Sequence, residues 1–354
     1  MSLGVPILPA LDEELIRAHD RVHGDLADAL DAANPHVSSL FRRFQRRVFQ
    51  ESLANVFLDH GPALMRPRRR FLTSAHRARL NGCDAAFRHV DSRLAMWRHG
   101  HVADVVGSDT LTVLNALVES HNPSSKETNP GLVRMTSAEF HEIETDYVPP
   151  PGSECAEILD AAIDMVERAP APAITRAGWL CAVLLAVHPF VDGNGRTARM
   201  AFQLVNSSGL TAGIDWGSIE QWSVGRQSYV QALKASQQPS APTYRAEAID
   251  TLPFIEYACR ASIAGAAVVH RRLTAFDEVW HSPWSSASDD HRLIETAAWA
   301  DSSATVDELT SLVSDPTCSV VIADLVLSQR LQWGRNGTVA IAPEHPIHSV
   351  FARH

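Results

Sequence analysis

One short segment of the chain, HPFVDGNGRTAR from His188 to Arg199, carries the residue types that phosphate chemistry requires. Gly193 and Gly195 allow a tight turn and let backbone N–H groups approach a ligand closely. We expect a helix to begin at about Gly195, where its free N–H groups and positive dipole end attract an anion. Pro189 should hold His188 in an extended conformation and end the preceding helix there. The segment therefore predicts an anion site at the start of a helix.

The side chains of this segment fit a polyphosphate ligand. Arg196 and Arg199 are three residues apart and share one face of the expected helix, from which both can reach phosphate oxygens. Asp192 offers a hard oxygen ligand for Mg²⁺, and Asn194 can donate an amide N–H to the same phosphate. His188, with an ordinary pKa of about 6.5, is mostly unprotonated at neutral pH and can accept a proton from an incoming hydroxyl.

Each of these features has a structural alternative. A histidine at a helix end is structural more often than catalytic, a glycine-rich turn before a helix is common, and two arginines usually face solvent. Because all of these residue types occur together in one short segment, the combination favours a functional site.

Helices on both sides must hold the segment in place. Residues 173–187 are apolar on nearly every side, which predicts a buried helix, and residues 195–207 form the helix that follows the glycines. Helical spacing of apolar residues predicts further helices at 11–60 (two, separated at Asn34-Pro35), 73–96, 154–168, 217–237 and 250–277.

Two other segments have a strand-like pattern. Leu132–His141 and Glu144–Val148 are predicted to form a short hairpin that ends at the prolines 149–151. After a linker rich in Pro, Ser and Trp, helices are predicted at 289–300, from the capping box Thr305-x-x-Glu308, and at 318–331. Asn336-Gly337 between two short runs then indicates a hairpin. Three helices followed by a hairpin is the order of a winged helix.

The loop resembles the signature of the Fic family, His-x-Phe-x-Asp/Glu-Gly-Asn-Gly-Arg-x-x-Arg, at every specified position from His188 to Arg199. The similarity extends over about Asn115 to Phe276. Gly131-x-x-Arg134, followed by Phe140–Val148, resembles the family's flap, a hairpin that clamps the target segment. Tyr229-x-x-Ala232-Leu233 resembles a helix that contributes to the family's adenosine pocket.

The resemblance implies a mostly α fold. It consists of a Fic-type helical bundle with a small β-hairpin flap, to which this chain adds the winged-helix-like α+β module. We expect three parts, which are an N-terminal helical region at 1–110, a Fic catalytic core at 111–280 and the winged-helix-like module at 289–354.

The resemblance also implies a protein adenylyltransferase, which moves AMP from ATP and Mg²⁺ to a Ser, Thr or Tyr hydroxyl of a target protein and releases pyrophosphate. His188 would be the general base, and Asp192 would bind Mg²⁺. The remaining roles follow the family pattern: an anion hole for the α-phosphate from Gly193, Asn194 and Gly195, contacts with the β- and γ-phosphates from Arg196 and Arg199, a loop anchor from Phe190, and the adenosine pocket from Tyr229.

Two alternatives to AMP transfer stay open. Fic-like sites can also transfer UMP, phosphocholine or a terminal phosphate, although the complete Gly-Asn-Gly-Arg-x-x-Arg pattern favours attack at the α-phosphate. The second alternative is a regulator that senses a nucleotide and binds DNA through the winged helix. His188 and Asp192 count against it, because sensing needs neither a base nor a metal.

Partners follow from the same reasoning. We expect the target protein to dock on the flap near Phe140–Val148. The family's inhibitory pattern, Ser/Thr-x-x-x-Glu-Gly/Asn, has no match, and Glu51 lies on an N-terminal helix with the wrong neighbours. The inhibitor is therefore a separate, antitoxin-like protein, a diverged helix, or missing altogether. Assembly into a homo-oligomer is a further option.

Bulk composition excludes several classes of protein. The net charge of −10 disfavours non-specific nucleic-acid binding, and the acidic C-terminal module favours a protein-docking or structural role over DNA. Basic clusters at 42–47 and 66–70 are read as solvated surface. The five scattered cysteines fit a reducing cytosol, so we expect a cytoplasmic protein. No uninterrupted apolar run of membrane-spanning length and no N-terminal signal pattern is found.

Overall fold

The computed structural model describes residues 4–54, 74–107, 109–121, 129–138, 147–211, 213–237, 243–282, 288–300, 304–313, 315–334 and 337–345. The chain forms two compact units. The first consists of Met1–Asp25, Phe49–Asp59 and Leu72–Ala266, and the second of Leu26–Val48, His60–Phe71 and Ala267–His354. The two units alternate along the chain, and the three consecutive parts that the sequence predicts stay a prediction. The units alternate because three long helices each contribute one end to each unit: α1 (Glu13–Ala32), α2 (Pro35–Ala54) and α11 (Leu252–Trp280).

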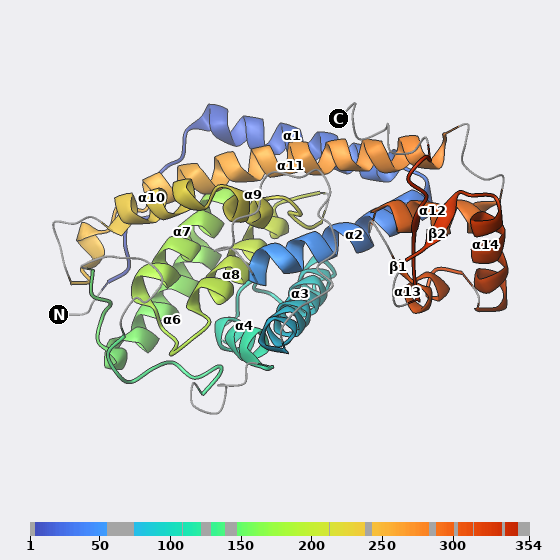
Figure 1. The fold of residues 1–354 in the computed structure, drawn as a ribbon. Coiled ribbons are helices and arrows are strands. Elements are labelled where there is room, and N and C mark those ends of the chain that lie inside the picture. The colour runs from blue at the N-terminus through green and yellow to red at the C-terminus, as the bar shows by residue number, and fades with distance from the viewer. Residues whose placement is uncertain are drawn as a thin grey trace. The chain divides into compact units, whose positions relative to one another are not determined.

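The first unit is built around two adjacent helices, α7 (Ala173–Val187) and α8 (Asn194–Ser208), which pack along each other (Figure 1). Every residue of α7 from Ala177 to Val187 is buried, as its uniformly apolar sequence predicts. Three more helices pack on this pair: α3 (Ser74–Arg98) and α4 (Thr110–Glu119) against α8, and α6 (Gly152–Arg168) against α7. The sequence did not predict α4.

Residues 217–237, predicted as one helix, form two. These are α9 (Ser218–Val224) and α10 (Arg226–Gln237), separated at Gly225. A glycine is a poor helix former because it has the most backbone freedom to lose. A short 3₁₀ helix, η1 (Ala246–Ala248), follows before α11.

The length and apolar composition of α11 are those of a membrane-crossing helix, but half of its most apolar window is buried inside the protein. Phe254, Ile255 and Cys259 on α11 have no exposed surface. Burial of this kind is what a core helix shows.

The predicted hairpin at Leu132–His141 and Glu144–Val148 is not seen in the part that the structure describes. Residues 132–138 contain no strand, residues 139–146 lie outside the described residues, and Val148 makes one isolated bridge with Thr243. The N–H of Arg134 donates to the carbonyl of Pro189 at 2.8 Å. Because the N–H of Arg134 is bonded to the loop after α7, it cannot donate to a facing strand of a hairpin.

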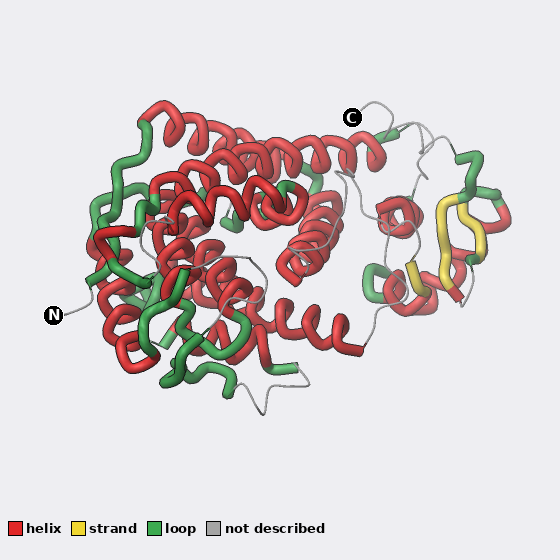
Figure 2. The backbone as a smooth tube through the Cα atoms, turned by 60° about the vertical axis from the view of Figure 1, so that its left-hand side comes forward, coloured by secondary structure: helices red, strands yellow, loops and turns green. Residues whose placement is uncertain are grey.

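The second unit contains a small sheet, which Figure 2 shows in yellow. Its elements are α12 (Asp289–Ala300), β1 (Ala304–Thr305), α13 (Val306–Thr310), α14 (Asp315–Leu327), β2 (Leu331–Trp333) and β3 (Thr338–Ile341). The strands are antiparallel in the order β1-β3-β2, with Thr305 opposite Thr338 and Leu331 opposite Ile341.

Three local predictions for this unit are confirmed: the helix at 289–300, the capping box between Thr305 and Glu308, and the final hairpin. The third helix ends at Leu327, earlier than predicted, and Gln329 shortly after it has a left-handed backbone with φ 59°. The winged-helix resemblance of this unit stays a prediction.

A buried polar network ties α1 to the core of the first unit. The Asp215 carboxylate accepts hydrogen bonds from the side chains of Asn206, Ser218 and Ser262, and the Ser262 hydroxyl lies 2.8 Å from the His23 imidazole. Burial favours a neutral carboxyl, but His23 and the hydrogen bonds from Ser218 outweigh burial and lower the pKa of Asp215. Burial lowers the pKa of His23 from 6.5 to about 4, although Asp215 opposes this shift.

The low pKa of His23 predicts acid sensitivity. As the pH falls below 6.5 the unfolded chain protonates this imidazole, whereas the folded protein does so only near pH 4. Stability is therefore unaffected above pH 6.5 and decreases between pH 6.5 and 4, by roughly 2 kcal/mol from pH 7 to pH 5. Urea unfolding at both pH values should show this loss, and His23→Gln should reduce it. The exposed His281→Gln is the control, and equal losses in both variants would contradict the prediction.

Candidate active site

His188 lies at the junction between α7 and the glycine-rich loop. Helix α7 ends at Val187, as predicted, and the His188 N–H still donates to the carbonyl of Leu184 at 3.0 Å. The prediction of an extended backbone is wrong, because His188 has the left-handed conformation φ 52°, ψ 57°. A left-handed residue is a common way to end a helix, and it turns the half-buried imidazole out of the helical path.

Arg134 holds this junction from the other side. Arg134 is 3% exposed. Nε donates to the carbonyl of His188 at 2.6 Å, and Nη2 to those of Val187 at 3.1 Å and Pro150 at 2.7 Å. A cation at the C-terminal end of a helix is favourable, because the last carbonyl groups of the helix have no partners within it. Arg134 therefore fixes the conformation in which His188 is presented.

Replacement of Arg134 should weaken the whole junction. Arg134→Ala leaves several buried carbonyl groups without donors, so we expect the free energy of unfolding to fall by about 2–4 kcal/mol. Urea denaturation measures this loss. Arg168→Ala removes an exposed surface ion pair with Asp164 and is the control, with an expected change below about 0.5 kcal/mol. Similar stabilities of the two variants would show that Arg134 does not hold the loop.

The loop itself is closed by Asn194. Its side-chain Oδ1 accepts from the N–H of Phe190 at 2.8 Å, and its Nδ2 donates to the carbonyl of Phe190 at 2.7 Å. Asn194 is 4% exposed and Phe190 1%, so both are inside the protein. Phe190 packs inward, as predicted. Asn194 locks the loop, and its predicted contact with a phosphate stays a prediction.

Helix α8 begins at Asn194, after Gly193 in a left-handed conformation with φ 77°. A Cβ atom on Gly193 would lie 2.5 Å from Oε1 of Glu119, so both the conformation and the space require glycine here. The N–H of Thr197 makes the first bond of the turn, to the carbonyl of Gly193 at 2.8 Å. The N–H groups before it have no acceptor within the helix, which is the arrangement that attracts anions to helix starts.

The two arginines of the loop have different partners. Nη2 of Arg196 lies 2.6 Å from Oε1 of Glu119 and 3.7 Å from Oδ1 of Asp192. Arg199 is 4% exposed, and its Nη2 donates to the main-chain carbonyl of Leu53 at 3.2 Å. Among the described residues Arg199 makes no ion pair, and its buried Nε has no hydrogen-bond partner. Within the part of the chain that the structure describes, Arg199 is thus a buried cation without a carboxylate partner.

Both arginines nevertheless reach the same region. Burial raises the pKa of the Cys83 thiol to about 11, against the opposing effects of Arg196 and Arg199. A Cβ atom on Gly195 would lie 3.1 Å from Nη1 of Arg199, which places this guanidinium beside the first turn of α8. The structure therefore brings two guanidinium groups to one helix start.

Residues 109–205 match the Fic/DOC family. They form a Fic/DOC domain. The chain is accordingly a Fic-type transferase of a nucleotide or another phosphate-containing group. No curated protein matches the chain.

Solved structures that are similar to this chain include Fic proteins. A Fic family protein from Desulfovibrio desulfuricans G20 has 14% sequence identity and a TM-score of 0.53, and the match covers 96% of this chain and 98% of that one. Fic-1 from C. elegans, at 18% identity, matches over 74% and 73% of the two chains with a TM-score of 0.49. A Fic domain containing signaling protein from Bacteroides thetaiotaomicron, at 13% identity, matches over 72% and 97% with the same score.

Asp192, the predicted Mg²⁺ ligand, lies at the exposed end of the loop. The side chain of Asp192 is 48% exposed, and its Oδ1 accepts from the N–H of Gly193 at 2.6 Å. Among the described residues no group of three or more His, Cys, Asp or Glu side chains forms a metal cluster. A single carboxylate fits Mg²⁺, which usually keeps several waters and takes other ligands from substrate phosphates.

Tyr229 lies inside the first unit. The side chain is 1% exposed and packs among Trp222, Phe254 and Tyr257, with ring centroids 5.6–6.2 Å away. Tyr229 is thus part of the core, and its predicted contact with adenosine stays a prediction. The tyrosine faces inward because α10 turns its apolar positions towards α9 and α11.

Several residues of the site were not predicted from the sequence. Asn115 and Glu119 lie one turn apart on α4, and Nδ2 of Asn115 donates to the carbonyl of Asp192 at 2.9 Å. Leu53, at the end of α2, contributes only a carbonyl group to Arg199. Asn115 and Glu119 could have been found in the sequence, because they are two polar residues at helical spacing in the otherwise apolar segment 110–119. Leu53 gave no such signal.

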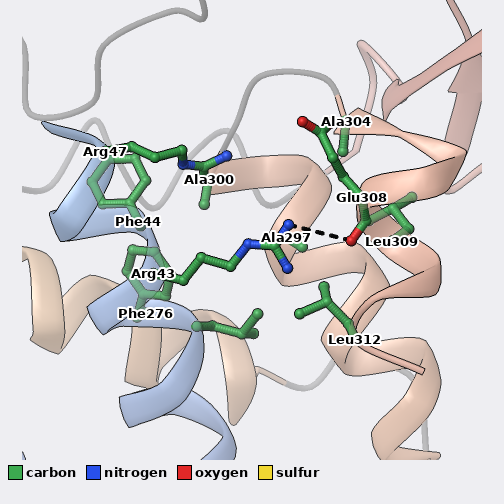
Figure 3. Close-up of a pocket in the computed structure, with 11 residues that line it drawn as sticks. Arg43, Phe44, Arg47, Phe276, Ala297, Ala300, Ala304, Glu308, Leu309 and Leu312 are labelled. Atoms are coloured by element: carbon green, nitrogen blue, oxygen red, sulfur yellow. Dashed lines mark hydrogen bonds between the residues drawn. The ribbon is translucent and has the colours of Figure 1, made fainter. Parts of the chain in front are cut away.

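A separate hollow lies wholly within the second unit (Figure 3), with an empty volume of about 290 Å³. Arg43 crosses it and donates to the carbonyl of Glu308 at 3.3 Å and to the hydroxyl of Ser311 at 2.8 Å. Phe44 and Phe276 form part of its wall. None of the residues of the Fic loop lines this hollow, so it is not the transferase site.

Proposed function

We propose that this protein transfers AMP from ATP to a Ser, Thr or Tyr hydroxyl of a target protein and releases pyrophosphate. The observation that carries the proposal is Arg199, a buried guanidinium beside the start of α8 that forms no ion pair among the described residues. Burying such a charge is costly unless an anion accompanies it. The phosphates of a nucleotide supply that anion.

Each loop residue has one task in this proposal. The His188 imidazole accepts the proton of the target hydroxyl. The hydroxyl oxygen then forms a bond to the α-phosphorus, while the bond from that phosphorus to the bridging oxygen breaks and pyrophosphate leaves with the electron pair. The N–H groups of Asn194 and Gly195 stabilise the charge on the α-phosphate, and Arg199 binds the departing phosphates.

Asp192 would hold Mg²⁺ beside these phosphates. The ion, when bound, neutralises phosphate oxygens and so favours departure of pyrophosphate. Asp192 itself is kept in place by the N–H of Gly193 and is near Arg196. This leaves the carboxylate exposed enough to share a metal with substrate oxygens.

The target protein is proposed to dock beside the loop. Leu132, Met135, Val148 and Val191, which are exposed apolar residues on the segments flanking the flap and in the loop, support this. Residues 140–146 of the predicted docking site lie outside the described residues. In the second unit, α14 carries the exposed apolar residues Val320 and Leu327 and has no Lys or Arg. This composition favours a protein partner of the second unit over DNA. A cytoplasmic location, a separate inhibitor and homo-oligomer formation belong to the same proposal.

Labelled ATP tests the proposal. The purified protein is incubated with Mg²⁺ and ATP labelled at the α- or at the γ-phosphate, with and without cell extract as the source of targets. We expect protein-bound label from the α position only, and an intact-mass increase of one AMP group on any modified protein. Protein-bound label from the γ position would show phosphate transfer and would refute AMP transfer.

A further inference from the structure

The last residue of α4, Glu119, places a buried carboxylate at the anion site. Its side chain is 1% exposed, and its Oε1 lies 2.6 Å from Nη2 of Arg196, whose side chain is 11% exposed. The carboxylate also lies directly behind the turn before α8, because a Cβ atom on Gly193 would be 2.5 Å from the same oxygen. Glu119 is therefore a charged neighbour of the loop, in contact with one of its two arginines.

Arg196 consequently differs from Arg199 in having carboxylates beside its guanidinium group. Arg196 has the Glu119 carboxylate at 2.6 Å, that of Asp192 at 3.7 Å and the carbonyl of Val118 at 3.4 Å. Arg199 has only the carbonyl of Leu53 among the described residues. Most of the positive charge that Arg196 would offer to a phosphate is already neutralised by the protein.

We propose that Glu119 is an internal counter-anion that weakens the binding of polyphosphate by neutralising Arg196. The proposal rests on the proposed function, since it concerns the affinity of the same site for its nucleotide. A carboxylate a few ångströms from the bound phosphates repels them, and within a protein this repulsion is screened much less than in water. Glu119 thus keeps the affinity for the nucleotide lower than the two arginines alone would give.

Glu119 cannot simply swing away when the nucleotide binds. A carboxylate at 1% exposure that loses its arginine is left uncompensated in the interior, which is strongly unfavourable. Its effect is therefore permanent and electrostatic, and it does not act as a movable gate. A substitution that removes the charge of Glu119 but keeps the shape of its side chain should therefore reveal this effect on affinity.

Glu119→Gln provides that change, because the amide has nearly the shape of the carboxylate but no charge. We expect the dissociation constants of Mg²⁺-tripolyphosphate and of Mg²⁺-ATP to fall about ten-fold, measured by isothermal titration calorimetry. In an Arg196→Ala background the same change should have an effect below about two-fold, because the arginine through which Glu119 acts is missing. Glu256→Gln removes the same charge from an exposed pair with Arg260 and is the control.

Unchanged or weaker binding by Glu119→Gln would overturn the proposal, and weaker binding would make Glu119 a positioning residue for Arg196. Absence of polyphosphate binding in both wild type and variant would overturn it as well. If Glu119→Gln does not fold, Glu119→Asp keeps the charge but withdraws it by one methylene, and we expect a smaller change in the same direction. The proposed function fails separately, when polyphosphate binds as expected but no α-label is transferred from ATP.

Discussion

His188→Ala is expected to reduce the rate of AMP transfer by about 10²–10⁴-fold, the usual contribution of a general base. Affinity for Mg²⁺-ATP should change by less than about two-fold, because the imidazole interacts with the incoming hydroxyl and the phosphates interact with the α8 end. The half-buried position of His188 at the end of α7 supports this division, since the phosphate-binding groups belong to the next helix.

Transfer of α-label to protein measures the rate of AMP transfer. Calorimetric titration with a non-hydrolysable ATP analogue measures the nucleotide affinity. His281→Ala, at an exposed histidine directly after α11, is the control and should leave both unchanged. If His188→Ala retains more than about a tenth of the rate, another group is the base. A comparable loss of nucleotide affinity would instead show that the substitution disturbs the loop.

Arg199→Met should produce the second large effect. The side chain of methionine fills much of the same space but has no charge, so loss of charge-assisted hydrogen bonds to phosphate should weaken Mg²⁺-ATP binding by about 10–100-fold. The free energy of unfolding without ligand should stay the same or increase, because a buried guanidinium that makes one carbonyl bond is replaced by an apolar group.

These two readouts separate a binding role from a structural one. A structural arginine would lower stability when replaced, whereas a ligand-binding arginine lowers affinity and not stability. Arg260→Met, at an exposed pair on α11, is the control. A clear loss of stability in Arg199→Met with unchanged ATP affinity would refute the role that we assign to Arg199.

The sequence alone was sufficient for α7 and α8, the two helices that meet at the loop. The apolar run before His188 predicted α7, and Gly193 together with Gly195 predicted the start of α8 to within one residue. The capping box at Thr305 was also identified correctly. These features depend on residues that are close in sequence, so helical spacing and glycine positions contain the information that they need.

The tertiary structure alone determined which groups meet at the loop. Glu119 contacts Arg196 although 77 positions separate them, and Arg134 reaches across 54 positions to the carbonyl of His188. Arg134 and the left-handed turn replace the extended backbone that Pro189 suggested. Local spacing has no information on such contacts, because they exist only after α4, α7 and α8 have packed together. The sequence therefore determined the chemical groups of the site, and packing determined the charges and hydrogen bonds that surround them.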